Sequence, residues 1–362
     1  LEEVFRSALR RKYGDDENKH KSNLIKDHHL GGLIFSLGNI KDQAKAINKF
    51  QEISKVPLLI SMDAEWGIGM RLDDAFSFPY NMTLGAIKND SLVYNVGKRI
   101  GYHAKRLGVH INFAPVVDIN TNPRNPIIGS RSFGEDKFNV ANKGISYLKG
   151  MHEYGIMGAA KHFPGHGDTE TDSHKTLPTI SFDKDRINDV ELYPFKKLIE
   201  NNLDGIMTAH LNIPNLDKKE ISTLSQKVIN NLLVNDLGFE GLVITDALDM
   251  KAIVDFSKGD YPDITALNAG NDLLLMPTDV AKSIKEIKKA YQKNKISPQR
   301  LESAVKKILH AKYKAGLSDL KPIEIDNIVD DLNQDIDYAL LDRVAEESIT
   351  LVKNQNLNIP LD

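Results

Sequence analysis

Short runs of apolar residues alternate along the chain with longer segments whose apolar positions recur with helical spacing. The apolar runs are rich in Val and Ile and are bounded by Gly, Pro or Asp, which is typical of strands buried on both faces. They cover residues 32–35, 57–62, 109–117, 157–161, 205–209, 241–245 and 272–276. Because the two patterns alternate, the sequence predicts parallel β/α architecture.

Three of the intervening segments have the period of amphipathic helices. Residues 91–107 carry apolar side chains at this spacing, and residues 45–50 and 228–237 do the same over shorter stretches. Ser225 precedes the last of these segments and is a candidate N-cap. The polar stretch 12–22 is predicted to be a loop or the start of a helix.

Seven apolar runs predict seven strands, and a weak eighth candidate lies at Val4-Phe5. Seven or eight strand–helix units over about 320 residues favour a (β/α)8 TIM-type barrel over a doubly wound sheet. The first strand is expected to be irregular or incomplete. No Gly-x-Gly-x-x-Gly opens a helix after the first apolar run, although a dinucleotide-binding fold would require one.

Composition and charge exclude several classes of protein. The 362 residues include 47 Lys and Arg against 50 Asp and Glu, so the net charge is −3 and a nucleic-acid partner is not expected. The absence of Cys excludes a thiol nucleophile, disulfides and Cys-ligated zinc. No apolar run approaches the roughly 18 residues of a transmembrane helix.

Ionisable side chains follow nearly every predicted strand. In a barrel the carboxyl ends of the strands meet at one face, so these side chains are expected to converge there. They are Asp63, Glu65, Arg71, Asp118, Arg131, Lys161, His162, His166, Asp168, Asp172, His174, His210, Asp246 and Asp249. Structural roles compete with this interpretation: the carboxylates of Asp63, Asp118 and Asp246 are suited to capping turns or helices, Arg71 and Arg131 to a solvated surface, and His210 to a buried strand end.

The densest group of these side chains lies in residues 161–174, which hold one Lys, three His and two Asp around two Gly. A metal site is disfavoured because Pro164 breaks the helix that would align His162 with His166, and no His-x-His follows the first predicted strand. Acid/base chemistry fits better. Asp172 and His174 lie two residues apart, so in an extended segment the carboxylate can orient the imidazole. Asp246 would then serve as a nucleophile.

The run Lys161-His162-Phe163-Pro164-Gly165-His166-Gly167-Asp168-Thr169, followed by Asp172-Ser173-His174, resembles glycoside hydrolase family 3, in its β-N-acetylglucosaminidase (NagZ-like) branch. Residues 243–250, 63–71 and 131–134 resemble further blocks of that family, in the same order. One departure is Trp66, the single tryptophan, which stands where the family usually has Gly. It is a candidate to narrow the pocket or to stack on a sugar.

The resemblance implies a retaining exo-β-N-acetylglucosaminidase that acts on oligosaccharides derived from peptidoglycan or chitin. Asp246 matches the family's nucleophile, His174 its general acid/base, and Asp172 the partner of that histidine. The positions that match its N-acetylglucosamine-binding residues are Asp63, Arg71, Arg131, Lys161 and His162. Neither a metal nor an organic cofactor is implied. The alternatives are a β-glucosidase, a β-xylosidase, a phosphorylase and a non-catalytic glycan-binding barrel.

The domain organisation is also inferred partly from the resemblance. Residues 1–335 are expected to form the catalytic barrel, and residues 336–362 a C-terminal helix and linker. Residues 345–354 resemble the junction that leads into a second domain in longer family members, so an additional C-terminal domain is expected. The compartment stays open between the bacterial cytoplasm and the cell envelope or exterior.

Overall fold

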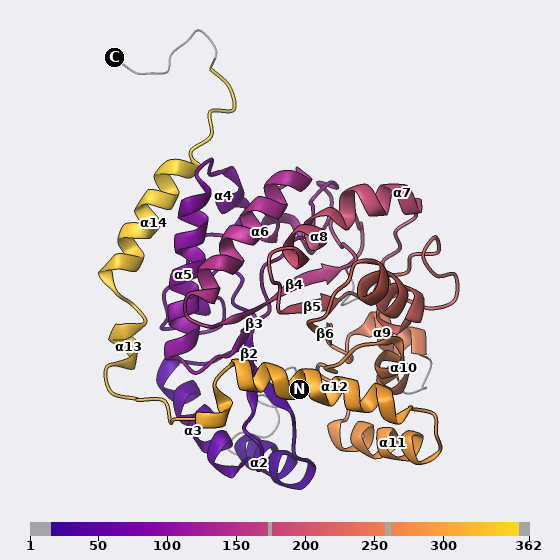
Figure 1. The fold of residues 1–362 in the computed structure, drawn as a ribbon. Helices are drawn as coiled ribbons and strands as arrows, with labels where there is room; N and C mark the ends of the chain where they lie inside the picture. The colour runs from indigo at the N-terminus through magenta and orange to yellow at the C-terminus, as the bar shows by residue number, and fades with distance from the viewer. Residues whose placement is uncertain (1–15, 173–175, 258–261, 355–362) are drawn as a thin grey trace.

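The computed structural model describes residues 16–172, 176–257 and 262–354, with only the backbone over residues 16–20. Within these residues six parallel strands form one sheet in chain order (Figure 1). The strands are β1 (Gly32–Phe35), β2 (Leu59–Met62), β3 (Ile111–Asn112), β4 (Met157–Phe163), β5 (Gly205–Thr208) and β6 (Leu242–Thr245). Every strand residue is buried, which agrees with the apolar runs of the sequence.

The sheet is a half-barrel, and the closed barrel of eight strands that we predicted is not confirmed. The run at residues 272–276 lies beside β6, but it forms a single parallel bridge, between Leu273 and Ile244. Its ladder is interrupted because the amide of Leu275 donates to the side chain of Thr245 rather than to a backbone carbonyl. The eighth candidate, Val4-Phe5, lies outside the described residues.

Helices connect the strands and pack against the sheet (Figure 1). The α-helices are α2 (Asp16–His28), α3 (Ile40–Ile53), α4 (Asn81–Ala86), α5 (Asp90–Arg106), α6 (Lys137–His152), α7 (Lys184–Arg186), α8 (Tyr193–Ile199), α9 (Lys251–Ser257), α10 (Pro262–Ala269), α11 (Val280–Gln292), α12 (Pro298–Lys314), α13 (Ile328–Asp331) and α14 (Asp335–Ser348). Shorter or wider helical turns are η1 (Ile68–Met70), η2 (Gly129–Arg131), η3 (Ile187–Glu191), η4 (Ser222–Leu224), η5 (Lys227–Asp236) and η6 (Leu317–Asp319).

The three amphipathic segments all form helices. Residues 91–107 correspond to α5, whose N-terminus is capped because the side chain of Asn89 accepts from the amide of Ser91. Residues 45–50 lie within α3, and residues 228–237 correspond to η5. The hydroxyl of Ser225 accepts from the amide of Val228, so the candidate cap is confirmed.

The apolar run at residues 109–117 forms a much shorter strand than predicted, because β3 covers only Ile111–Asn112. Pro115 lacks an amide hydrogen and therefore cannot donate to a ladder there. The chain still follows β4, since the amide of Lys161 donates to the carbonyl of Pro115 and the amide of Val117 donates to the carbonyl of Lys161. These bonds keep residues 115–118 at the carboxyl end of the sheet.

Alternate residues of each strand enter two separate parts of the hydrophobic core. Ile60 and Val243 pack with the surrounding helices, whereas Leu59 and Ile244 belong to a second cluster lined by the opposite face of the sheet. This period of two is the expected consequence of strand geometry. Since both faces are apolar, the polar groups at the strand ends are the exception that marks a site.

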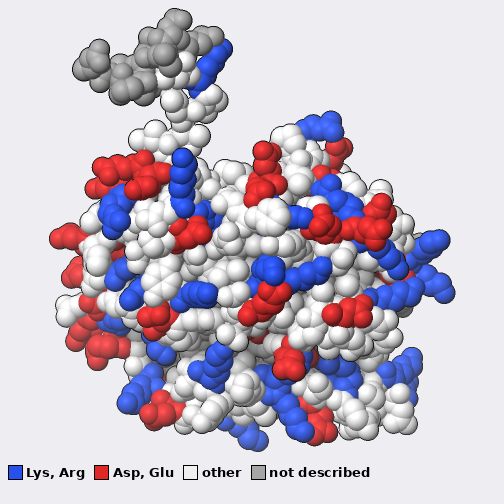
Figure 2. All heavy atoms as spheres, turned by 45° about the horizontal axis from the view of Figure 1, so that its top comes forward, with Lys and Arg blue, Asp and Glu red and all other residues white. Residues whose placement is uncertain are grey.

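The C-terminal helix predicted from residue 336 onward corresponds to α14, which packs beside α4 and α5 (Figure 1). Arg99 on α5 donates to the carboxylate of Asp337 at 2.7 Å, which ties α14 to the barrel. In the described part of the chain no helix is long and apolar enough to cross a membrane. On the face seen in Figure 2, basic and acidic side chains are interspersed, in keeping with the balanced charge.

Candidate active site

A cavity of about 780 Å³ opens at the carboxyl ends of the strands. Six of the eight residues that the sequence assigns to catalysis or sugar binding line it, and they follow or end strands β2, β4 and β6 or lie in the loops beyond β2 and β3. These residues are Asp63, Arg71, Arg131, Lys161, His162 and Asp246. The predicted convergence of polar side chains therefore occurs, for these six residues, around a single space.

Lys161 is the most enclosed cation of the site, with 2% of its side chain exposed. Its ammonium group lies 2.7 Å from a carboxylate oxygen of Asp63 and 2.8 Å from one of Glu65. Burial raises the pKa of the Asp63 carboxyl, but Lys161 and Arg71 outweigh that effect and leave the pKa below its usual value. Asp63 and Glu65 are therefore charged near neutral pH and hold Lys161 in one position.

Arg131 and Arg71 complete the charged lining. Arg131 donates two parallel hydrogen bonds to Glu65, at 3.0 and 2.8 Å, in the bidentate geometry that fixes a guanidinium plane. Arg71 donates to the carboxylate of Asp63 at 2.9 Å and to its carbonyl at 3.1 Å. Three cations and two anions thus form one continuous ion-pair network along a wall of the cavity.

His162 is held between Asp118 and Arg131. Its Nδ1 atom lies 2.6 Å from Asp118 Oδ2, and its Nε2 atom lies 3.3 Å from a guanidinium nitrogen of Arg131. Because the guanidinium can only donate, Nε2 must accept and the proton of the ring sits on Nδ1. Asp118 also accepts from the amides of His162 and His166, so it sets both the tautomer and the path of the backbone.

His166 lies behind His162, with the two ring centres 6.0 Å apart. Its Nδ1 atom is 2.7 Å from the hydroxyl of Thr169. Burial and the neighbouring His162 lower the pKa of His166 to about 4, so this imidazole is neutral at physiological pH. Neutral His166 adds no positive charge to the part of the cavity that it lines.

Asp246 follows β6, the last strand in the sheet order, and its side chain lines the cavity. Its Oδ1 atom accepts from the amide of Ala247 at 2.8 Å, and its own amide donates to the carbonyl of Thr208. The helix that follows begins only at Lys251, so Asp246 is not the N-cap that its structural interpretation suggested. Its carboxylate is instead a backbone-oriented group at the cavity wall.

Buried side chains behind the cavity hold the loop that carries Asp63 and Glu65. The side-chain amide of Asn112 pairs with both backbone groups of Ala64, at 2.9 and 3.0 Å. The hydroxyl of Tyr147 lies 3.0 Å from the carbonyl of Ala64 and 3.1 Å from that of Glu65. With its backbone fixed in this way, the loop presents two carboxylates at defined positions.

Among the described residues that the sequence singles out, five do not appear in the lining of the cavity: Trp66, Asp118, Asp168, Asp172 and His210. Trp66 packs edge-on against Tyr80, with ring centres 4.6 Å apart, so it neither narrows the cavity nor is placed to stack on a sugar within it. His210 is buried between Thr223 and the carbonyl of Ala247, which fits its structural interpretation. Asp172 lies beyond the lining, and His174, the expected acid/base, lies outside the described residues.

Further ionisable residues lie in the lining or behind it, although the sequence assigns them no catalytic or sugar-binding role. Glu65 and His166 line the cavity, and Asp118 lies behind it. Asp249 and Lys251, just after Asp246, line it too. For Glu65 the sequence does contain a signal, namely the alternation of side-chain direction in β structure. Glu65 lies two residues beyond Asp63, so its side chain is expected to point in the same direction.

The chemistry that this arrangement supports is recognition of a polyol together with one carboxylate placed to react. Alternating cations and anions can donate to and accept from several hydroxyl groups of a ligand at once. Among the described residues, no group of three or more His, Asp or Glu side chains is arranged to hold a metal ion. His162 and His166 were the alternative candidates for metal ligands. Their Nδ1 atoms are within hydrogen-bond distance of Asp118 and Thr169 respectively.

Comparison with known proteins gives consistent matches. The model of the family described as "Glycosyl hydrolase family 3 N terminal domain" matches residues 6–311. A Pseudoalteromonas piscicida protein named Beta-hexosaminidase A is 35% identical over 81% of this chain and 55% of its own length. A Cellulomonas fimi protein named Beta-N-acetylglucosaminidase/beta-glucosidase is 28% identical over 93% of this chain and 62% of its own.

Among solved structures, a glycoside hydrolase family 3 beta-N-acetylglucosaminidase from Paenibacillus sp. str. FPU-7 superposes with a TM-score of 0.88. It is 36% identical, and the match covers 94% of this chain and 66% of that one. The chain thus spans 55% and 62% of the two named relatives' lengths.

Proposed function

Because this chain belongs to glycosyl hydrolase family 3, we propose that it is a retaining exo-β-N-acetylglucosaminidase. Its substrate would be an oligosaccharide with a terminal, non-reducing, β-linked N-acetylglucosamine, of peptidoglycan or chitin origin. The name of the Paenibacillus protein supports this sugar, and that of the Pseudoalteromonas protein supports a hexosaminidase; both share more than a third of their aligned residues with the chain.

The observation that carries the proposal is the position of Asp246 across one cavity from the ion-pair network. Asp63 would accept hydrogen bonds from two sugar hydroxyls, while Lys161 and Arg71 would donate to others. Arg131 and His162 would contact the remaining polar groups of the same ring. Since these side chains are already paired with one another, the sugar would meet a preorganised surface, which lowers the entropy cost of orientation.

In the proposed first step, the Asp246 carboxylate attacks the anomeric carbon from the α face. The bond from that carbon to the glycosidic oxygen breaks, and the departing oxygen takes a proton from the imidazolium of His174. The product is an α-linked glycosyl-enzyme and a free aglycone. Asp172 would hydrogen-bond the imidazole and stabilise its charged form.

In the second step the neutral imidazole of His174 removes a proton from water, and the water oxygen attacks the anomeric carbon. The ester bond to Asp246 breaks, so the sugar leaves in the β configuration and the overall reaction retains stereochemistry. A histidine suits this role because its ordinary pKa lies near 6.5, whereas a second carboxylic acid beside Asp246 would need a strongly raised pKa to stay protonated.

A second activity is worth testing because the Cellulomonas protein carries both names. The experiment compares release of p-nitrophenol from the β-N-acetylglucosaminide and from the β-glucoside, with wild-type protein and Asp246→Ala side by side. We expect the N-acetylglucosaminide to be strongly preferred and its turnover to vanish in the variant. Preference for the glucoside would overturn the sugar assignment, and turnover by Asp246→Ala would overturn the nucleophile.

A further inference from the structure

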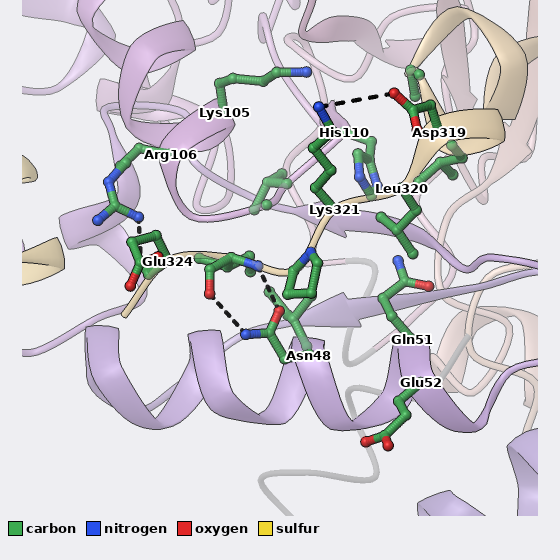
Figure 3. Close-up of a pocket in the computed structure, with 18 of the residues that line it drawn as sticks. Asn48, Gln51, Glu52, Lys105, Arg106, His110, Asp319, Leu320, Lys321 and Glu324 are labelled. Carbon is green, nitrogen blue, oxygen red and sulfur yellow. Dashed lines mark hydrogen bonds and ion pairs between the residues drawn. The ribbon is translucent and has the colours of Figure 1, made fainter. Parts of the chain in front are cut away.

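A second cavity, of about 1100 Å³, lies at the opposite end of the sheet from the candidate active site. His110 lines it and directly precedes β3, whereas Asp63 follows the carboxyl end of β2. Its walls come from α3, from the end of α5 and from residues 315–324, which follow α12 (Figure 3). No lining residue is shared with the candidate active site.

The walls of this cavity are joined by specific hydrogen bonds. Asn48 on α3 bonds both backbone groups of Ile323, at 2.9 and 2.7 Å (Figure 3). Arg106 at the end of α5 donates to the carbonyl of Glu324 at 2.6 Å. Residues 323–324 are therefore fixed to two helices, and the cavity is a built feature of the fold.

His110 contributes a hydrogen-bond donor at the inner end of the cavity. Its Nδ1 atom accepts from the amide of Ile60 at 2.9 Å, so in the neutral ring the proton is on Nε2. Only 8% of the residue is exposed, and within the described part of the chain no acceptor is bonded to Nε2. Burial, with the charges of Lys105 and Lys312, lowers the pKa of His110 to about 4, so the ring is neutral.

Lys312 on α12 is a buried cation whose charge acts on His110, although it is not itself among the residues that line the cavity. It is 6% exposed, and among the described residues its ammonium group has neither a hydrogen bond nor an ion pair. Two other lysines of α12 do form ion pairs, Lys307 with Asp272 and Lys314 with Asp204. Burial lowers the pKa of Lys312 to about 8, and a group with that pKa is still mostly charged at neutral pH. An uncompensated buried charge is costly, so an anion that reached it would be bound favourably.

The lining of the cavity holds more basic than acidic side chains, together with apolar ones. Five basic side chains line the cavity against three acidic ones, and Lys105 has no ion-pair partner among the described residues. Figure 3 shows Lys105 and Lys321 on the side of the cavity where His110 lies, with Glu52 on the opposite wall. Ile47, Val109 and Leu317 supply apolar contact surface between them.

We propose that this cavity is a non-catalytic binding site for a small phosphorylated molecule, whose phosphoryl group is bound by His110 and Lys105 and attracted by the unpaired charge of Lys312 near His110. A phosphoryl dianion has three terminal oxygens, so it can accept from donors that approach from different elements, which a planar carboxylate does less well. The apolar lining would contact the rest of the ligand. The volume is ample for a sugar phosphate, since small-molecule sites usually range from about 300 to 1,000 Å³.

The test is isothermal titration calorimetry with two probes, inorganic phosphate and glucose 6-phosphate, with acetate at matched ionic strength as reference. We expect saturable binding of one equivalent of each phosphate probe, and at least about tenfold weaker binding by Lys312→Met, which removes the charge but keeps the apolar stem. Lys306→Met, on the exposed side of the same helix, is the matched control and should bind as the wild type does. Tighter binding of the sugar phosphate than of phosphate alone would identify an ester as the ligand.

The variant Arg71→Met distinguishes phosphate bound in the second cavity from phosphate bound in the active-site cavity. If phosphate binds in the second cavity, this variant should bind it with unchanged affinity. Loss of binding in Arg71→Met with full binding in Lys312→Met would overturn the proposal, as would the absence of saturable binding or equal affinity for acetate. Lys105→Gln, an exposed position, is the second variant if Lys312→Met fails to fold, with about threefold to fivefold weaker binding expected.

Discussion

The ammonium group of Lys161 lies 2.8 Å from a carboxylate oxygen of Glu65, and the two side chains are 2% and 1% exposed. Two cations, Lys161 and Arg131, thus share one buried anion to which the sequence pattern alone gives no role in the site. The sugar-binding geometry that we propose depends on this carboxylate, because it holds Lys161 and Arg131 in place.

Replacement of Glu65 should therefore strongly destabilise the protein. Glu65→Ala takes the carboxylate partner from Arg131 and one of two carboxylate partners from buried Lys161, which we expect to cost about 3–5 kcal/mol of unfolding free energy. Urea denaturation measures this. The matched control is Glu302→Ala, which removes an exposed pair with Lys306 and should leave the unfolding free energy nearly unchanged. Similar costs for the two variants would contradict the structural role of Glu65.

The pH dependence of stability should reveal the buried histidines. The pKa values of His110 and His166 are lowered to about 4, so the unfolded chain binds their protons first as the pH falls below 6.5. Their contribution to stability is complete above pH 6.5 and is lost progressively towards pH 4. His166→Asn should reduce the slope of unfolding free energy against pH by up to about 1.4 kcal/mol per pH unit in this window. Urea titrations between pH 6.5 and 5 give the slope, and an unchanged slope would refute the shift.

Gly167 should be essential to the loop that carries Asp172. A Cβ atom at this position would lie 1.8 Å from the carbonyl oxygen of Ile119, so Gly167→Ala must push the loop away from residues 118–120. We expect turnover of p-nitrophenyl N-acetylglucosaminide to fall at least about tenfold, because small displacements of catalytic groups are costly. Gly31→Ala is the matched control, since nothing lies within 4 Å of its added Cβ. Equal activity of both variants would rule out this role for the loop.

Much of the site is predictable because strand direction places the residue after each apolar run at one face. Asp63, His162 and Asp246 follow from this rule alone. The rule also implies that Trp66 faces away from the cavity, because residues 63 and 65 share one direction and residue 66 takes the other. The expectation that Trp66 narrows the pocket or stacks on a sugar was wrong because it gave a rare residue beside a motif more weight than this alternation.

The fold is predictable in its layers but not in its closure. Continuous apolar runs identify all six strands and period-3.6 patterns identify three of the helices, since burial on one or both faces leaves a direct trace in the sequence. Whether a run such as residues 272–276 completes a ladder depends on bonds from residues far away in the chain. Here Thr245 takes one of those amides with its side chain. The second cavity escapes prediction for a similar reason, because His110 and Lys312 lie about 200 residues apart.

His174→Ala tests the acid/base assignment through the leaving group. An aryl group with an acidic phenol departs without protonation, whereas a sugar alkoxide does not, so general acid assistance matters mainly for the sugar. We expect kcat/KM to fall about 10²–10⁴-fold for an N-acetylglucosamine disaccharide and much less for p-nitrophenyl N-acetylglucosaminide. Equal losses on both substrates would remove His174 from this role.

The most direct measurement of the central claim is to trap the glycosyl-enzyme. A 5-fluoro-N-acetylglucosaminyl fluoride should form the intermediate quickly and release it slowly, so that intact-protein mass spectrometry detects one added sugar. Peptide mapping should place that sugar on Asp246, and Asp246→Asn should show no adduct. A sugar attached to any other residue, or rapid turnover of natural substrate by Asp246→Asn, would contradict the account.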